Sequence, residues 1–477
     1  MVWTALQKYS QMAIQFVSGI ILARLLTAYD YGCIGMLSIF MALAETFIDS
    51  GFGSALIQKK QPTQEDYSTI FWWNLGMAVL MYALLFVFAP AISRFYKIPL
   101  LCDVLRVQGL VLFIYAFNIV QRNQLKKKLN FKALSITTIV TSIISLSVTI
   151  WMAYKGFGVW ALVAQNLITA AIPAVVFWFF IKWRPILAFS VASFKELFSF
   201  GVFMFLTNIV NKFFSKLTGL LIGKLYTPAT LGYYSKALGV ENLASHSISS
   251  VMTQVTYPLY AQVQDNKEVM SSMVRRLTMT IAFITFPMMF VLMLAAKPIF
   301  ILLYSERWLQ SVPFFQVLCL IGLSECLQAV NTQTIAAIGK SNLMFRWTLI
   351  KRTVGLVFVI GGLVFFGMWG LMVGMVIFNW FCYAVNMGLV SKYIGYGWKK
   401  QLLDLAPMAM VSGLAALVSF GCGRMLHLSL YLDGILKIVV CIAIYLAWAL
   451  LFKPEAYEYT LTIIPVRFRV LGKKEKR

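Results

Sequence analysis

The sequence Leu22-Ala-Arg-Leu-Leu-Thr-Ala-Tyr-Asp-Tyr-Gly32 joins two long apolar segments, and a similar sequence occurs 200 residues later. The second copy is Ile222-Gly-Lys-Leu-Tyr-Thr-Pro-Ala-Thr-Leu-Gly232. An ungapped overlay of residues 19–50 on 219–250 gives eight identities in 32 positions, against roughly two or three expected by chance in so apolar a chain. This fixed offset indicates an internal repeat.

The composition is that of a membrane protein. Of the 477 residues, 60% are hydrophobic and only 12% are charged, which is about half the charged fraction of a typical soluble protein. Apolar runs long enough to cross a bilayer follow one another along the chain. We predict fourteen spans, at about 4–25, 33–57, 69–93, 103–121, 133–153, 158–181, 199–225, 236–261, 275–296, 311–337, 347–366, 369–391, 403–423 and 433–452.

The formal net charge of +24 comes from basic residues in the short loops between spans. This distribution is typical of membrane topology, so we do not expect nucleic acid as a partner. With the N-terminus in the cytoplasm, 28 of the 41 Lys and Arg residues lie in cytoplasmic segments and ten in external loops. The bias predicts that both termini are cytoplasmic. The seven cysteines are scattered and form no CxxC pair, so no disulfide framework or metal site is expected.

The offset of the repeat predicts the domain organisation. It places the first span on the seventh and the second on the eighth, with an even number of spans between the copies, so both copies have the same orientation. We therefore expect an all-α polytopic membrane protein with two parallel six-helix lobes, at residues 1–182 and 200–392. A cytoplasmic linker at 183–199, two further helices at 393–453 and a basic cytoplasmic tail at 454–477 complete the prediction.

A polar stripe follows one face of the seventh span. Asn208, Lys212 and Lys216 are spaced four residues apart, and Asn211 lies beside them. A lysine at bilayer depth is costly unless it faces a cavity or a counter-charge. The stripe therefore predicts either a cavity that binds an anion such as pyrophosphate, or ion pairs between the lobes.

The first span carries Gln11 and Gln15 at a similar spacing. In the overlay these residues occupy the positions of Asn211 and Ser215, so corresponding faces of the two helices are polar. Amides at these positions suit either sugar hydroxyls in a cavity or hydrogen bonds between helices.

Four carboxylates fall inside predicted spans: Glu45 and Asp49 in the second, Glu241 in the eighth and Glu325 in the tenth. Acidic groups at bilayer depth can exchange protons or hold a cation, which would couple transport to an H⁺ or Na⁺ gradient. Alternatively, they neutralise the lysines of the seventh span when no substrate is bound. No cofactor is expected.

Three further basic residues are candidates for the cavity. Arg24 and Lys224 end the two copies of the repeat on the outer side, where they form either the rim of a cavity or anchors at the membrane interface. His246 lies in the middle of the eighth span, where it is either a structural, hydrogen-bonded histidine or a carrier of protons.

Short motifs spread over the chain carry a family resemblance. They are Leu22-Ala-Arg-Leu-Leu-Thr27 with Tyr31-Gly32, Asp49-Ser-Gly-Phe-Gly-Ser-Ala-Leu-Ile-Gln58 with Gln64-Glu-Asp66, Gln124-Leu-Lys-Lys-Lys-Leu-Asn-Phe131, Phe200-Gly201 and Tyr257-Pro-Leu-Tyr260. In their order and spacing the chain resembles the oligosaccharide flippases of the multidrug/oligosaccharidyl-lipid/polysaccharide exporter (MOP) superfamily, in particular the fourteen-helix Wzx-type polysaccharide exporters.

The resemblance implies a transporter and not an enzyme. Such a flippase moves undecaprenyl-pyrophosphate-linked oligosaccharide from the inner to the outer leaflet of the bacterial cytoplasmic membrane by alternating access, for O-antigen, capsule or exopolysaccharide synthesis. Membrane lipids, and the polymerase and chain-length machinery, are further partners that it implies. A cation-coupled drug antiporter of the MATE type and a lipid II flippase are the alternatives. A membrane glycosyltransferase is disfavoured because no long loop is available to hold an acceptor.

Overall fold

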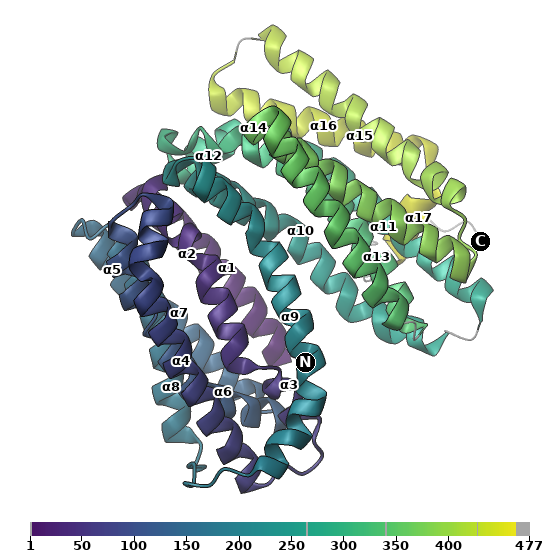
Figure 1. Cartoon of the computed structure of the whole chain (residues 1–477). Helices are drawn as coiled ribbons and strands as arrows, with labels where there is room; N and C mark the ends of the chain where they lie inside the picture. The colour runs from purple at the N-terminus through teal and green to yellow at the C-terminus, as the bar shows by residue number, and fades with distance from the viewer. Residues whose placement is uncertain (1, 264–265, 339–340, 427, 464–477) are drawn as a thin grey trace. The chain divides into compact units, whose positions relative to one another are not determined.

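The computed structural model describes residues 2–263, 266–338, 341–426 and 428–463. Their contacts divide the chain into two compact units, Met1–Ser235 and Lys236–Arg477. The described residues form seventeen α-helices and one short 3-10 helix, without a strand (Figure 1). The predicted all-α class is therefore confirmed.

The first unit contains nine helices and the beginning of a tenth among its described residues. Helix α7 packs against α1 and α8, and α9 packs against α2, α3 and α4. The helices are α1 (Val2–Leu25), α2 (Ala28–Asp49), α3 (Phe52–Gln58), α4 (Gln64–Tyr96), α5 (Leu100–Gln108), α6 (Val111–Lys127), α7 (Phe131–Tyr154), α8 (Val159–Phe180), α9 (Val191–Leu225) and the start of α10 (Pro228–Gln262).

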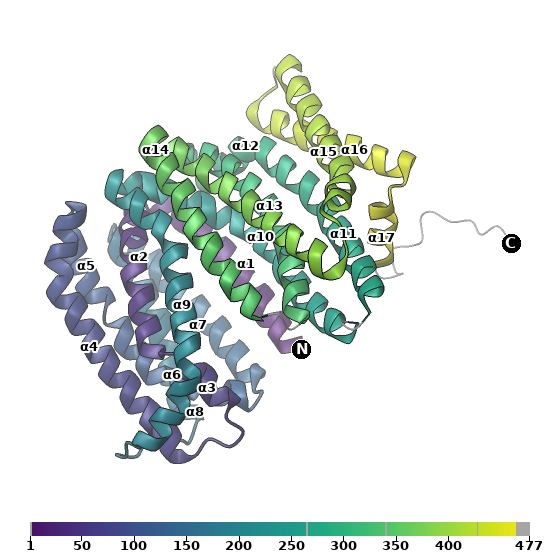
Figure 2. The ribbon, with the colours of Figure 1, turned by 45° about the vertical axis from the view of Figure 1, so that its right-hand side comes forward.

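The second unit is built around α11, which packs against α13, α15, α16 and α17. Figure 2 shows α15 and α16 running beside each other in this unit. After the remainder of α10, its elements are α11 (Lys267–Leu294), α12 (Ala296–Tyr304), η1 (Glu306–Trp308), α13 (Ser311–Ala337), α14 (Ser341–Ile394), α15 (Trp398–Leu426), α16 (Leu430–Phe452) and α17 (Glu455–Ile463).

The fourteen predicted spans all fall on these helices. Ten segments of the described chain are long and apolar enough to cross a membrane, and α9, bent by 55° near Gly201, would be an eleventh. Helix α14 is counted as one of the ten segments. Its backbone breaks at Gly367, where φ is 61° and ψ is −144°, and two of the predicted spans lie on either side of this break. Helices α1 and α10 are not among the segments that are apolar enough to cross a membrane. Both carry polar side chains that line cavities described below.

The threonines of the repeat begin helices. Thr27 Oγ1 accepts a hydrogen bond from the backbone N–H of Asp30 (3.3 Å), and the Asp30 carboxylate accepts one from the N–H of Thr27 (2.9 Å), which forms a capping box at the start of α2. In the second copy, Thr227 Oγ1 accepts from the N–H of Thr230 (3.1 Å) at the start of α10. The shared threonine is therefore a helix cap.

The glycines of the repeat allow the two corners to touch within the first unit. A Cβ atom on Gly32 would lie 1.8 Å from the carbonyl oxygen of Pro228, and one on Gly232 would lie 1.8 Å from that of Ala28. The backbones of α2 and α10 therefore approach each other more closely than any other residue type would permit. The two copies of the repeat meet through corresponding residues.

The start of α9 is also held by glycine contacts. A Cβ atom on Gly51, whose φ is 77°, would lie 2.2 Å from the carbonyl oxygen of Gly201, next to the bend in α9. Through such contacts α9 groups with the first unit, whereas the repeat predicts that residues from 200 onward begin the second lobe. The predicted lobe boundaries stay a prediction.

Candidate functional site: a cationic cavity

A cavity of about 930 Å³ lies inside the first unit. Its walls come from helices distant in sequence, with Gln7 and Gln11 on α1, Glu45 on α2, and Lys212 and Lys216 on α9. Helices α6, α7 and α8 contribute most of the remaining wall, with hydroxyl, amide, basic and apolar side chains. Four residues predicted from the sequence as cavity or coupling candidates, Gln11, Glu45, Lys212 and Lys216, are thus brought together.

The cavity is strongly cationic. Arg122 and Lys126 of α6 face it together with Lys212 and Lys216 of α9. Among the described residues that line it, Glu45 is the one carboxylate. Four cations against one anion leave a formal excess of positive charge in a partly dehydrated space, where Coulomb interactions are stronger than in bulk water. Such a cavity favours a polyanionic group.

Arg122 and Lys126 are functional candidates that sequence reasoning missed. By the charge count they belong to a cytoplasmic loop, but the structure places them within α6. A signal was present, because Asn118, Arg122 and Lys126 repeat every four residues. The same order of one amide and two cations occurs in the stripe on α9.

Asp49 lies in a smaller adjoining pocket of about 160 Å³. This pocket shares Asn118, Arg122 and Lys126 with the large cavity. Asp49 therefore shares cations with the large cavity, although it is not among the residues that line it. The carboxylate also lies against α3, since a Cβ atom on Gly53 would be 2.8 Å from Asp49 Oδ1.

Several polar atoms around the cavity make no hydrogen bond within the described part of the chain. They are Gln108 Oε1, Asn118 Oδ1 and the Thr141 hydroxyl, all buried. A buried polar group without a hydrogen bond costs about 1–3 kcal/mol, so these atoms favour a cavity that holds polar ligands or water. Gln7 differs, because its side chain donates to Thr138 Oγ1 (3.2 Å) and accepts from Ser135 Oγ (3.3 Å).

The other candidates from the two stripes and the corners lie elsewhere in the first unit. Gln15, Asn208 and Asn211 are not among the residues that line the cavity, and the first two are exposed. Arg24 is exposed at the end of α1. Lys224 is exposed at the end of α9, where its ammonium donates to the carbonyl oxygen of Phe95 (2.6 Å) and lies 3.9 Å from the centre of the Phe95 ring.

The second unit has its own polar pocket, of about 400 Å³, which contains Glu325. Lys351 and Arg352 of α14 line it, although the charge count assigns them to a loop, and Lys351 donates to Asn386 Oδ1 (2.9 Å). Glu241 is 2% exposed and is not among the lining residues; its carboxylate lies against α13. The side chain of His246 lies outside the described part of the chain.

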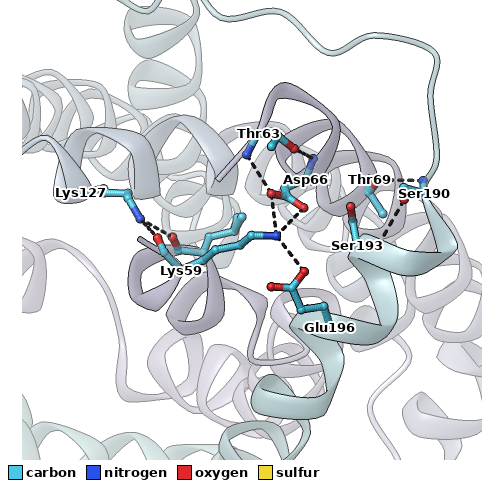
Figure 3. Close-up of polar contacts among 9 residues, drawn as sticks. Lys59, Thr63, Asp66, Thr69, Lys127, Ser190, Ser193 and Glu196 are labelled. Carbon is cyan, nitrogen blue, oxygen red and sulfur yellow. Dashed lines mark hydrogen bonds and ion pairs between the residues drawn. The ribbon is translucent and has the colours of Figure 1, made fainter. Parts of the chain in front are cut away.

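An ion-pair cluster ties the start of α9 to the loop between α3 and α4 (Figure 3). Lys59 Nζ lies 3.0 Å from the carboxylate of Asp66 and 2.9 Å from that of Glu196. Burial alone would lower the pKa of Lys59, but the hydrogen bonds to Glu196 and Asp66 outweigh it and raise the pKa above its usual value.

The predicted linker is tied to α4 by hydrogen bonds. The backbone N–H of Ile186 donates to Ser68 Oγ (3.1 Å), and that of Ser190 donates to Thr69 Oγ1 (3.0 Å). Trp72 Nε1 donates to the carbonyl oxygen of Ile186 (2.8 Å). The segment before α9 is therefore held along the first turns of α4.

The fold defines the class of protein. The structure aligns with that of the lipid II flippase MurJ in an inward closed conformation at a TM-score of 0.74, with 12% identity, over 94% of this chain and 98% of the other. A MATE family multidrug resistance transporter of the MOP superfamily, in an inward-facing conformation, aligns at 0.61 with 15% identity, over 82% and 96% of the two chains. The chain therefore has the multi-pass, all-α fold of these MOP-superfamily membrane proteins.

The chain belongs to the polysaccharide biosynthesis protein family, whose model matches residues 21–313. It is 26% identical to the teichuronic acid biosynthesis protein TuaB of Bacillus subtilis over 72% of each chain. It is 24% identical to the lipopolysaccharide biosynthesis protein WzxC of Escherichia coli over 76% of this chain and 74% of that one. The succinoglycan biosynthesis transport protein ExoT of Rhizobium meliloti is 24% identical over 85% and 80%. These matches confirm the family resemblance and support a flippase role.

Proposed function

We propose that this protein translocates an oligosaccharide linked to undecaprenyl pyrophosphate from the inner to the outer leaflet of the bacterial cytoplasmic membrane, for assembly of a surface polysaccharide. The observation that carries the proposal is the cavity with Arg122, Lys126, Lys212 and Lys216 in its wall. A pyrophosphate diester carries two negative charges and several acceptor oxygens, which four cationic donors can match. The names of the relatives support a role in polysaccharide biosynthesis.

The residues of the cavity wall suggest which part of the cargo each of them binds. The cations of α6 and α9 hold the pyrophosphate, while the amides and hydroxyls bind the sugars, chiefly Gln11, Asn118, Thr141 and Asn166. The polyprenyl chain stays in the lipid, because hydrocarbon is its favoured surroundings and a wall that carries four cations is not. Alternating access then exposes the cavity to each side of the membrane in turn.

Glu45 has two alternative roles in this proposal. In the first, it offsets part of the positive charge of Lys212 and Lys216 while the cavity is empty, and the arriving pyrophosphate replaces it. In the second, it offers a site for a proton or a sodium ion, through which a gradient drives the cycle. A comparison of transport into vesicles with and without a proton or sodium gradient separates the two, since the first role needs no gradient.

The excess positive charge disfavours the drug antiporter, because a cavity that repels cations is poorly suited to cationic drugs. The charge of the cavity does not distinguish the proposed function from that of a lipid II flippase, since lipid II carries the same pyrophosphate. The identity of the lipid that accumulates in a deletion strain distinguishes the two flippases.

The experiment is deletion of the gene in its host, followed by complementation. We expect lipid-linked repeat units to accumulate on the cytoplasmic leaflet while surface polysaccharide disappears. Complementation by the double variant Lys212→Ala/Lys216→Ala should fail, whereas a control that removes two exposed lysines, Lys128→Ala/Lys195→Ala, should succeed. Unchanged polysaccharide in the deletion strain would refute the function, and full complementation by Lys212→Ala/Lys216→Ala would refute the assigned site.

A further inference from the structure

A second basic pocket, of about 560 Å³, lies at one end of the second unit. It forms where the first turns of α11 and α15 meet the last turn of α14. Lys267 and Arg275 of α11, Lys392 of α14 and Lys400 of α15 line it. Three separate helices thus direct basic side chains to one pocket, which the proposed transport cavity does not explain.

One of these four basic side chains, Arg275, already forms ion pairs within the protein. Arg275 donates from Nε and Nη2 to the two oxygens of Asp404 (2.7 and 2.8 Å), and its Nη1 lies 2.7 Å from the carboxylate of Glu455. Among the described residues that line the pocket, Glu268 is the one carboxylate. Three lysines against one glutamate therefore remain for a ligand.

The remaining donors suit a phosphate group. Lys267, Lys392 and Lys400 are exposed and carry compact ammonium groups, each with three donor hydrogens. Ser271 and Ser272 add two hydroxyls to the wall. Charge-assisted hydrogen bonds from such groups to phosphate oxygens are roughly twice as strong as those between neutral groups.

The wall between α14 and α15 is fixed by side chains. Tyr396 Oη donates to Asp404 Oδ2 (2.7 Å), and Gln401 Nε2 donates to the carbonyl oxygen of Tyr396 (2.7 Å). Gly395, with φ 86°, makes the turn. The backbone of the pocket is thus ordered before a ligand arrives, which lowers the entropy cost of binding.

Apolar surface begins one turn below the lysines. Leu403 follows Lys400 by three residues on the same face of α15 and is 72% exposed, and Trp398 at the start of α15 is 50% exposed. Helix α15 is apolar and long enough to cross a membrane. An exposed tryptophan next to exposed leucine is the pattern that membrane proteins show at the level of the lipid headgroups. A ligand here meets cations at one end and hydrocarbon at the other.

We propose that this pocket binds the phosphate of an anionic phospholipid, with Lys267, Lys392 and Lys400 around the headgroup and an acyl chain along Leu403. The bound lipid would join the ends of α11, α14 and α15. The proposal does not depend on the cargo of the transport cavity, since all the residues involved lie in the second unit.

The test is native mass spectrometry of the full chain in detergent, titrated with phosphatidylglycerol or phosphatidylcholine. We expect wild-type protein to bind phosphatidylglycerol preferentially, and the triple variant Lys267→Gln/Lys392→Gln/Lys400→Gln to lose roughly tenfold or more in affinity. A matched triple variant, Lys60→Gln/Lys128→Gln/Lys195→Gln, removes the same charge from exposed positions in the first unit and should keep wild-type affinity. Equal affinities of all three proteins would overturn the proposal.

A second probe separates a lipid from a soluble phosphate. Glycerol 3-phosphate carries a phosphate without acyl chains, and we expect it to displace phosphatidylglycerol only at a large molar excess. If it binds the wild-type protein as tightly as the lipid does, the pocket is a soluble-phosphate site and the lipid proposal is wrong. Thermal unfolding of each variant checks that a lost lipid does not reflect a lost fold.

Discussion

At the scale of single residues, the cavity is distinguished by two matching stripes on different helices. Asn118, Arg122 and Lys126 on α6 repeat the spacing of Asn208, Lys212 and Lys216 on α9, and both pairs of cations line one cavity. Each lysine or arginine is costly at bilayer depth without a ligand or counter-charge, and Glu45 is one carboxylate among four cations. The balance of charge leaves room for an anionic cargo.

Removing the α6 pair should impair transport as severely as removing the α9 pair. We expect Arg122→Ala/Lys126→Ala to reduce flipping by at least about tenfold, because each lost charge-assisted hydrogen bond is worth about 1.5–3 kcal/mol. Flipping of a labelled lipid-linked oligosaccharide in proteoliposomes measures this. The charge-preserving variant Arg122→Lys/Lys126→Arg should retain most of the activity. If the alanine variant flips the lipid at the wild-type rate, the cations of α6 are not part of the binding site.

The glycine at the corner of the repeat allows a second prediction at this scale. Gly32→Ala should destabilise the protein by about 2 kcal/mol or more, because the new methyl group would overlap the backbone of Pro228 and force the helices apart. Gly76→Ala in α4 is the control, since a Cβ atom there meets no other atom within 4 Å. That change should be neutral or stabilising, as alanine favours a helix. A melting temperature of Gly32→Ala equal to that of the control would contradict the close approach.

At the scale of the elements, α9 connects the packing of the first unit to its cavity. It packs on α2, α3 and α4, bends next to the Gly51–Gly201 contact and carries two of the four cavity cations. Its first turns are held by the Lys59 cluster and by the linker along α4. Anything that loosens these contacts should also loosen the position of Lys212 and Lys216.

The two carboxylates that contact Lys59 should differ in their value to stability. Asp66 is 1% exposed and also caps α4 by accepting from the N–H of Thr63 (2.8 Å), so Asp66→Ala should cost about 2 kcal/mol or more. Glu196 is 62% exposed, and solvent screening should keep the cost of Glu196→Ala below about 1 kcal/mol. Thermal unfolding in detergent compares them. Equal losses would contradict the greater contribution of the buried Asp66 to stability.

At the scale of the whole molecule, each of the two units contains a polar cavity lined by its described residues. Helices α1 and α10 each line one of these cavities, which explains why neither is apolar enough to resemble an ordinary membrane span. Among their polar residues, Gln7 and Gln11 of α1 and Asn242 and Ser249 of α10 face these cavities. This distribution is the one that a carrier of polar cargo requires.

The charge of the larger cavity predicts a difference from drug exporters with the same fold. Cells that lack their own drug exporters should gain no resistance to a lipophilic cationic dye when they express this protein, because the four cations repel it. The minimum inhibitory concentration of the dye measures this, with a known drug exporter as the positive control. Resistance that disappears in a Glu45→Gln variant would instead favour the antiporter.

The sequence by itself determined the membrane class, the positions of the long helices, the repeat and the cationic stripe on α9. These features are local or periodic, because hydropathy, helical spacing and a fixed offset can be read without knowing which helices touch. Even the threonine and glycine shared by the two copies, Thr27 with Thr227 and Gly32 with Gly232, can be found in this way. Their roles as helix caps and contact points cannot.

Only the tertiary structure decided which polar residues share a cavity. It joined Lys212 and Lys216 to Arg122 and Lys126 and left Gln15, Asn208 and Asn211 outside the wall. Which face of a helix meets a cavity depends on how six or more helices pack around it, and the spacing along one helix carries no information on its neighbours. For the same reason the basic pocket of Lys267, Lys392 and Lys400, on three separate helices, could not be seen in the sequence.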